Sequence, residues 1–120
     1  MQKKTLVLGA SDNPSRYSYL AVQRLVSHQH PVVAIGKKEA KVNETNILTG
    51  QPVLENIDTV TLYLNAQRQK EYYNYILSLH PKRIIFNPGA ENDELFDLAK
   101  ANGIQSLEAC TLVMLSTGQY

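Results

Sequence analysis

The fold class is decided by residues 5–16, which read TLVLGASDNPSR. The apolar run of residues 5–8 ends at Gly9, as is typical of a short strand buried on both faces of a parallel sheet. A polar turn follows, and apolar side chains then recur at helical spacing as far as His28. This segment therefore predicts the strand, turn and helix that begin an alternating α/β fold.

The predicted helix begins within this same segment. Proline is tolerated in the first turn of a helix, so we expect the helix to open near Pro14 or Ser15. Asn13 or Ser15 would then cap it, because their side chains accept hydrogen bonds from free main-chain N–H groups.

Strands and helices keep alternating along the rest of the chain. Apolar or β-branched runs predict strands at residues 31–35, 59–64, 83–86 and 104–107. Helices are predicted from Asn65 to Pro81, from Asn92 to Gly103 and over residues 110–117, with the two asparagines as caps. The alternation predicts a Rossmann-like, doubly wound and mainly parallel sheet of about five strands with helices on both faces, as one domain over residues 1–120.

One stretch of this pattern is less regular. Residues 37–46 are polar and lack periodicity, so we interpret them as a loop. Ile47 and Leu48 follow as a short edge strand, and Gly50 with Pro52 turns the chain away.

Composition and charge limit the class of protein to which the chain can belong. Of 120 residues, 43% are apolar and 19% charged, which suits a globular chain that buries a core. The formal net charge of +1 supplies no overall field, so neither nucleic acid nor a membrane is expected as a partner. Cys110 is the single cysteine, the three histidines lack ligand spacing, and no signal-peptide core is visible. We therefore expect a cytoplasmic protein without a metal site.

The turn from Gly9 to Arg16 carries the first signal of ligand binding. In doubly wound sheets such a turn presents main-chain N–H groups and a helix N-terminus, which favour phosphate. Ser11, Asn13 and Ser15 add hydrogen-bonding groups, and the Arg16 guanidinium suits phosphate oxygens. Only the first glycine fits the G-x-G-x-x-G dinucleotide pattern, so a plain strand-to-helix turn remains the alternative.

The end of the second predicted strand, Gly36-Lys37-Lys38, indicates which nucleotide would bind. An NAD site has a carboxylate here for the ribose hydroxyl. Two cations instead favour an adenosine with an additional ribose phosphate, as in coenzyme A (CoA) or NADP. A solvated pair of lysines is the alternative.

Four ordered motifs extend over nearly the whole chain: residues 9–16, Gly50-Gln51-Pro52-Val53, residues 87–92 (NPGAEN) and Glu108-Ala109-Cys110. Together they resemble the small stand-alone CoA-binding domain proteins, which are similar to the CoA-binding domain of the succinyl-CoA synthetase α subunit. The resemblance implies a Rossmann-like fold that holds the pyrophosphate at residues 9–16 and the 3′-phospho-ADP end near the two lysines. Many relatives end the second strand in Asn-Pro, where this chain has Ile35-Gly36-Lys37. The synthetase's phosphohistidine loop and second domain have no counterpart, so its reaction is not implied.

The candidate site combines the two loops with a third, Asn87-Pro88-Gly89, which follows a strand at the same edge. Tyr17 is included because it follows Arg16 and would border the ligand. The residues predicted to bind the cofactor are Gly9, Ala10, Ser11, Asn13, Pro14, Ser15, Arg16, Tyr17, Gly36, Lys37, Lys38, Asn87, Pro88 and Gly89. Cys110 carries a separate hypothesis, a mixed disulfide with the pantetheine thiol, against the alternative of a half-buried structural cysteine.

The sequence leaves three functions open. The favoured one is binding of CoA or an acyl-CoA without catalysis, because no triad, paired acids or Tyr-x-x-x-Lys arrangement is present. The others are an enzyme that uses NADP or an acyl-CoA, and a regulatory subunit that senses a nucleotide. The expected partner is a small nucleotide ligand, and a homo-oligomer or a partner enzyme is left open.

Overall fold

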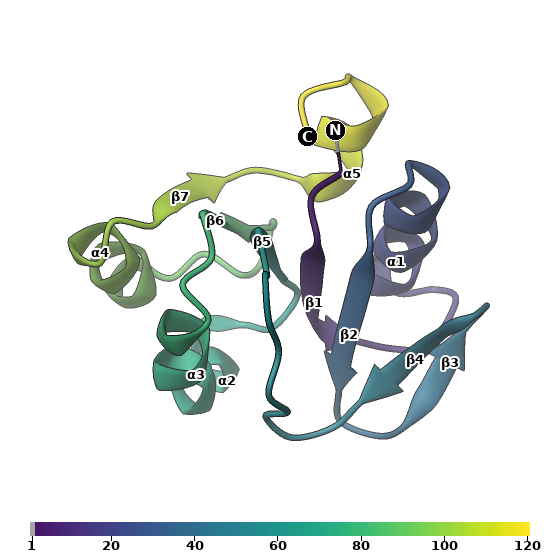
Figure 1. Cartoon of the computed structure of the whole chain (residues 1–120), viewed down its shortest axis with the longest axis horizontal. Coiled ribbons are helices and arrows are strands. Elements are labelled where there is room, and N and C mark those ends of the chain that lie inside the picture. The colour runs from purple at the N-terminus through teal and green to yellow at the C-terminus, as the bar shows by residue number, and fades with distance from the viewer. Residues whose placement is uncertain (1) are drawn as a thin grey trace.

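The computed structural model describes residues 2–120, which form one seven-stranded sheet with helices on both faces (Figure 1). The strand order is β3-β4-β2-β1-β5-β6-β7, and all neighbours are parallel except β3 and β4. The strands are β1 (Thr5–Ala10), β2 (Val32–Gly36), β3 (Ala40–Val42), β4 (Thr45–Leu48), β5 (Thr59–Leu62), β6 (Arg83–Phe86) and β7 (Gln105–Glu108). The helices are α1 (Tyr17–Ser27), α2 (Ala66–Gln69), η1 (Lys70–Tyr72), α3 (Tyr73–Ser78), α4 (Asp93–Ala101) and α5 (Thr111–Ser116).

The chain starts at the centre of the sheet and reverses direction once. From β1 it moves outward to β2 and then to the edge strand β3, and it turns back through β4, which lies between β2 and β3. It then crosses to β5 on the other side of β1 and continues to β6 and β7. The loops after β1 and β5 therefore diverge, and a crevice opens between the carboxyl ends of these two strands. Doubly wound sheets bind ligands at this kind of switch point.

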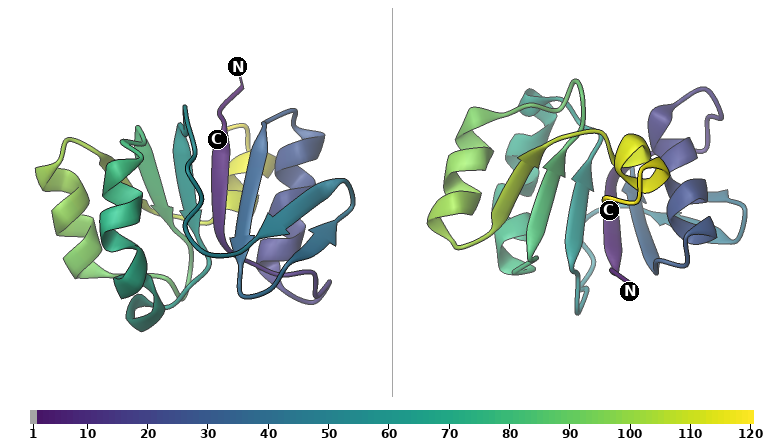
Figure 2. Two further views of the ribbon diagram at one scale, coloured as in Figure 1. Left: turned by 60° about the horizontal axis from the view of Figure 1, so that its bottom comes forward. Right: turned by 90° about the horizontal axis from the view of Figure 1, so that it is seen from above.

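The helices divide into two layers, as the views in Figure 2 show. Helices α1 and α5 pack on one face, where Leu25 and Met114 meet Val7 of the central strand. The other face is covered by α3 and α4, which contribute Ile76 and Leu95 to a second cluster. Both faces of β1 are thus buried, which accounts for its continuous apolar sequence.

Local signals predicted several elements correctly. Strand β6 has the predicted bounds, residues 83–86. The side chain of Asn65 accepts a hydrogen bond from the main-chain N–H of Arg68 at 2.9 Å, and Asn92 accepts one from Leu95 at 3.3 Å. Both asparagines are therefore the helix caps that the sequence predicts.

The interpretation of residues 37–46 as a loop is wrong. The chain forms a hairpin in which β3 and β4 pair in antiparallel fashion, and the turn uses Asn43 at φ 53°, a left-handed conformation that asparagine tolerates. Val42 and Ile47 are buried on it. Strand β4 is not an edge strand, because it lies between β2 and β3, and this hairpin brings the sheet to seven strands instead of about five.

The predicted start of the first helix is also wrong. Helix α1 begins at Tyr17, and its N-cap residue, Arg16, makes no side-chain capping bond. The side chain of Asn13 instead accepts hydrogen bonds from the main-chain N–H and the hydroxyl of Ser15, at 3.0 and 2.8 Å. This local turn takes up the capping groups and delays the helix.

Within residues 2–120, no helix has the length and apolar character that crossing a bilayer requires.

Candidate functional site

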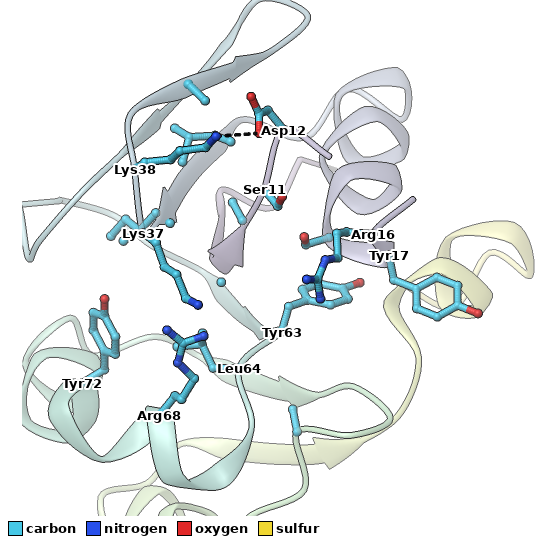
Figure 3. Close-up of a pocket in the computed structure, with 18 of the residues that line it drawn as sticks. Ser11, Asp12, Arg16, Tyr17, Lys37, Lys38, Tyr63, Leu64, Arg68 and Tyr72 are labelled. Atoms are coloured by element: carbon cyan, nitrogen blue, oxygen red, sulfur yellow. Dashed lines mark ion pairs between the residues drawn. The ribbon is translucent and has the colours of Figure 1, made fainter. Parts of the chain in front are cut away.

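A cavity of about 540 Å³ lies at the carboxyl ends of β1, β2, β5 and β6 (Figure 3). Its walls come from the β1–α1 loop, the β2–β3 loop, α2 with η1, and the loop after β6. The lining residues are Gly9, Ala10, Ser11, Asp12, Arg16, Tyr17, Ser18, Ile35, Gly36, Lys37, Lys38, Ala40, Ile47, Tyr63, Leu64, Arg68, Glu71, Tyr72, Pro88, Gly89 and Ala90. Ten of the fourteen residues predicted from the sequence are among them.

Two glycines let the main chain close up beneath this cavity. Gly9 has φ +95°, and a Cβ atom there would lie 2.9 Å from the main-chain carbonyl of Tyr63. At Gly36 a Cβ atom would lie 2.3 Å from the main-chain oxygen of Ala10. Side chains at these positions would push apart the strands that carry the cavity floor.

The β1–α1 loop contributes its two ends to the cavity but not its middle. Asn13, Pro14 and Ser15, which the sequence predicted as binding residues, do not line the cavity. The turn around Asn13 explains this, because its side chain is occupied within the loop. Arg16 and Tyr17 line the cavity as predicted, at the N-terminus of an eleven-residue helix whose dipole favours anions.

Four cationic side chains line the cavity: Arg16, Lys37, Lys38 and Arg68. Lys38 is engaged by an acid, since its Nζ lies 3.9 Å from Oδ1 of Asp12. Both side chains of this pair are well exposed, at 77% and 42%, so their mutual attraction is weak. The cavity therefore has a net positive character, which suits a ligand with several phosphates.

The loop after β6, like the β1–α1 loop, contributes only some of its residues to the cavity. Pro88 and Gly89 line the cavity, but Asn87, which the sequence also predicted as a binding residue, does not. The buried amide of Asn87 donates to the Thr61 hydroxyl at 2.7 Å and to the Leu62 carbonyl at 2.9 Å, and its oxygen accepts from the Thr111 N–H at 2.8 Å. Its role is to join β5, β6 and the start of α5.

Sequence reasoning missed the wall formed by the segment after β5. Tyr63, Leu64, Arg68, Glu71 and Tyr72 all line the cavity. Asn65 was recognised as a helix cap, and the cap itself was the available signal: it fixes the first turn of a helix that starts at the switch point.

The two tyrosines on this wall stay neutral near pH 7. Burial raises the pKa of Tyr63 well above its ordinary value. Burial also raises the pKa of Tyr72, with a further increase from Glu71 and an opposing effect of Arg68. Both side chains therefore present a neutral phenol and not a phenolate, although the hydroxyl oxygen of Tyr63 is itself buried.

Cys110 is half-buried and is the N-cap residue of α5. Its side chain does not line the cavity. This geometry gives no support to a mixed disulfide with a ligand thiol, and it fits the alternative of a structural cysteine.

No group of three or more His, Cys, Asp or Glu side chains in the described part of the chain is arranged to hold a metal ion.

Comparison with known proteins finds one matching family model. The family model described as "CoA binding domain" matches residues 3–116. A solved structure described as that of an uncharacterized protein is 52% identical, with a TM-score of 0.97 over 100% of this chain and 99% of that one. A comparison with curated proteins finds none that matches.

Two more distant structures share the fold. One is a hypothetical protein from Pyrococcus horikoshii OT3, with 20% identity and a TM-score of 0.87 over 97% of this chain and 83% of that one. The other is cell-free ID.343 from Thermus thermophilus, with 18% identity and a TM-score of 0.86 over 99% and 91% of the two chains.

Proposed function

The chain belongs to the CoA-binding domain family, and on that basis we propose that it binds CoA or an acyl-CoA in the cavity at the carboxyl edge of the sheet. The observation that carries this proposal is the union of four cations and a helix N-terminus in one cavity at the strand-order switch. A volume of about 540 Å³ lies within the range of small-molecule sites.

We assign the pyrophosphate to the β1–α1 loop. Support comes from Arg16, whose guanidinium reaches the cavity beside the start of α1. The missing Cβ atom of Gly9 leaves room for the main chain of Tyr63, so the start of this loop lies directly against the segment after β5. The N-terminus of α1 at the other end of the loop favours a phosphate.

We assign the adenosine to the other end of the cavity, between β2 and the segment after β5. Ala40 and Leu64, both partly exposed, supply apolar surface there, and the buried Ile35 and Ile47 lie behind it. The pantetheine arm would leave past Tyr63 toward Pro88, on the far side of the switch point. This arrangement uses every wall of the cavity.

We propose further that the protein binds its ligand without transforming it. The polar lining consists of four cations, the main chain of loops, three phenols, among them the two whose pKa values burial raises, two serine hydroxyls and two carboxylates. Of the carboxylates, Asp12 is paired with Lys38, and Glu71 is the other. Ser11, the lining hydroxyl nearest the assigned pyrophosphate, already accepts a hydrogen bond from the main-chain N–H of Asn13 at 3.0 Å. Incubation with acetyl-CoA should release no free thiol above the buffer rate, and steady hydrolysis would contradict this part of the proposal.

Calorimetric titration with CoA, acetyl-CoA, NADP and NAD tests the ligand. CoA and acetyl-CoA should bind at least about ten-fold more tightly than either nicotinamide nucleotide, a difference of about 1.4 kcal/mol in binding free energy. Tight binding of NADP with none of CoA would overturn the proposal. Mass spectrometry of the purified protein under native conditions gives an independent check, through any ligand that remains bound.

A further inference from the structure

The cations of the cavity do not form one group. Lys38 turns toward Asp12 beside the β1–α1 loop. Lys37, its neighbour in the chain, turns the other way, and its amino group faces the guanidinium of Arg68 across the cavity (Figure 3). These two facing cations come from opposite sides of the switch point, one from the loop after β2 and one from the helix after β5.

No carboxylate neutralises this facing pair. The ion pairs within residues 2–120 are those of Lys38 with Asp12 and of Lys82 with Asp58. Glu71 lines the same cavity one helical turn after Arg68 but lies outside ion-pair distance of it. Two like charges that face each other repel, and an anion held between them converts this repulsion into attraction to both.

The backbone holds Arg68 in place for this role. The cap at Asn65 fixes the first turn of α2 through the Arg68 N–H, and the next residue, Gln69, is fully buried. The arginine side chain itself is exposed, so only the guanidinium is free to adjust to a ligand. Because the main chain of Arg68 is already held in place, a bound ligand orders only the end of its side chain, and this limits the conformational entropy lost on binding.

We propose that Lys37 and Arg68 clamp a phosphate monoester on the ribose of the bound nucleotide, and that Arg68 takes the place in this subsite that the sequence predicted for Lys38. The inference rests on the proposed function, in which Arg16 serves the pyrophosphate. A monoester carries close to two negative charges and three accessible oxygens, enough for one cation on each side. CoA and NADP both carry such a group, and dephospho-CoA and NAD lack it.

The test is calorimetric titration of CoA and dephospho-CoA against the wild type and single variants. Arg68→Gln and Lys37→Gln should each weaken CoA by about ten-fold, because a charge-assisted hydrogen bond is lost, and leave dephospho-CoA within about two-fold. Lys38→Ala should leave the preference for CoA over dephospho-CoA within about two-fold of wild type, because Lys38 is paired with Asp12 and does not face the clamp. Lys70→Ala is the matched control, since it removes an exposed cation two residues from Arg68 and outside the cavity.

Each other outcome rejects the clamp. It is rejected if Arg68→Gln weakens both ligands equally, if Lys70→Ala has the same effect, if Lys38→Ala abolishes the preference for CoA, or if the wild type has no preference. The pair NADP and NAD separates the clamp from the proposed function. If the wild type ignores CoA and prefers NADP over NAD, and Arg68→Gln removes that preference, the clamp stands and CoA binding fails.

Discussion

The side-chain amide of Gln69 donates a hydrogen bond to the main-chain oxygen of Ala90 at 2.8 Å, joining two walls of the cavity. The same nitrogen donates to the Leu64 oxygen at 2.8 Å, and the Gln69 oxygen accepts from the amide of Asn92, also at 2.8 Å. Gln69 is fully buried. Since Leu64 and Ala90 both line the cavity, this one side chain sets the distance between the segments after β5 and β6.

Replacing Gln69 with Ala should therefore affect both stability and binding. Two carbonyls and one amide lose a partner in a buried place, and we expect a loss of about 2–4 kcal/mol in the free energy of unfolding. Urea denaturation measures it. Affinity for CoA should also fall, because the two walls lose their fixed spacing. Gln67→Ala on the exposed side of α2 is the control and should change neither quantity.

Gly36 tests the close approach of the strands. In Gly36→Ala the new Cβ atom would lie 2.3 Å from the main-chain oxygen of Ala10, so β1 and β2 must separate. We expect a loss of about 3 kcal/mol or more, at the upper end of the range for overpacking. Gly50→Ala is the comparison: Gly50 has φ +75° and nothing within 4 Å, so the cost there is backbone strain alone, about 1 kcal/mol. Equal losses in urea denaturation would show that crowding at Gly36 is unimportant.

The sequence predicted the elements whose signals are local. Strand β6 is a continuous apolar run, and the caps at Asn65 and Asn92 stand directly before helical patterns. The hairpin of β3 and β4 was missed because its burial rests on isolated residues such as Val42 and Ile47 within a polar stretch. Short strands of this kind carry too few residues to establish a period of two.

The candidate site could likewise be predicted from the sequence only in part. Residues next to the ends of β1 and β2 were found, because a topological rule places ligands there. Arg68 was not, since its approach to Lys37 depends on how α2 is set against the sheet by the buried Gln69. Asn87 follows β6 at a position suited to a ligand contact, but its side chain turns inward to Thr61, and the sequence carries no sign of this orientation.

Arg16 tests the pyrophosphate assignment. CoA and dephospho-CoA share the pyrophosphate, so Arg16→Ala should weaken both by a similar factor of about ten. This pattern differs from that expected for Arg68→Gln, which should affect CoA alone. Arg24→Ala, on an exposed position of the same helix and outside the cavity, is the matched control. Unchanged affinity in Arg16→Ala would remove this residue from the site.

At the amino ends of the strands, away from the cavity, His30 takes part in a contact between the two ends of the described chain. Its Nδ1 accepts a hydrogen bond from the main-chain N–H of Lys3 at 3.0 Å, so this nitrogen carries no proton. The ring lies 4.8 Å from that of Tyr120, centroid to centroid, and Tyr120 also stacks beneath the Arg83 guanidinium. Burial, and then the charges of Lys3, His28 and Arg83, lower the pKa of His30 below its usual 6.5.

Stability should therefore fall on the acidic side of neutrality. A histidine whose pKa is lower in the folded state binds protons more readily when unfolded, so its neutral form stabilises the fold fully above about pH 6.5. This contribution is lost as the pH falls below that value and through the lowered pKa of the folded state. Urea denaturation between pH 7.5 and pH 5 should show the decline in wild type. His30→Asn keeps an acceptor but cannot be protonated, and its decline should be smaller. His80→Asn, at an exposed position with a left-handed backbone that asparagine tolerates, should follow the wild type. Parallel curves for His30→Asn and wild type would show that protonation of His30 does not weaken this contact.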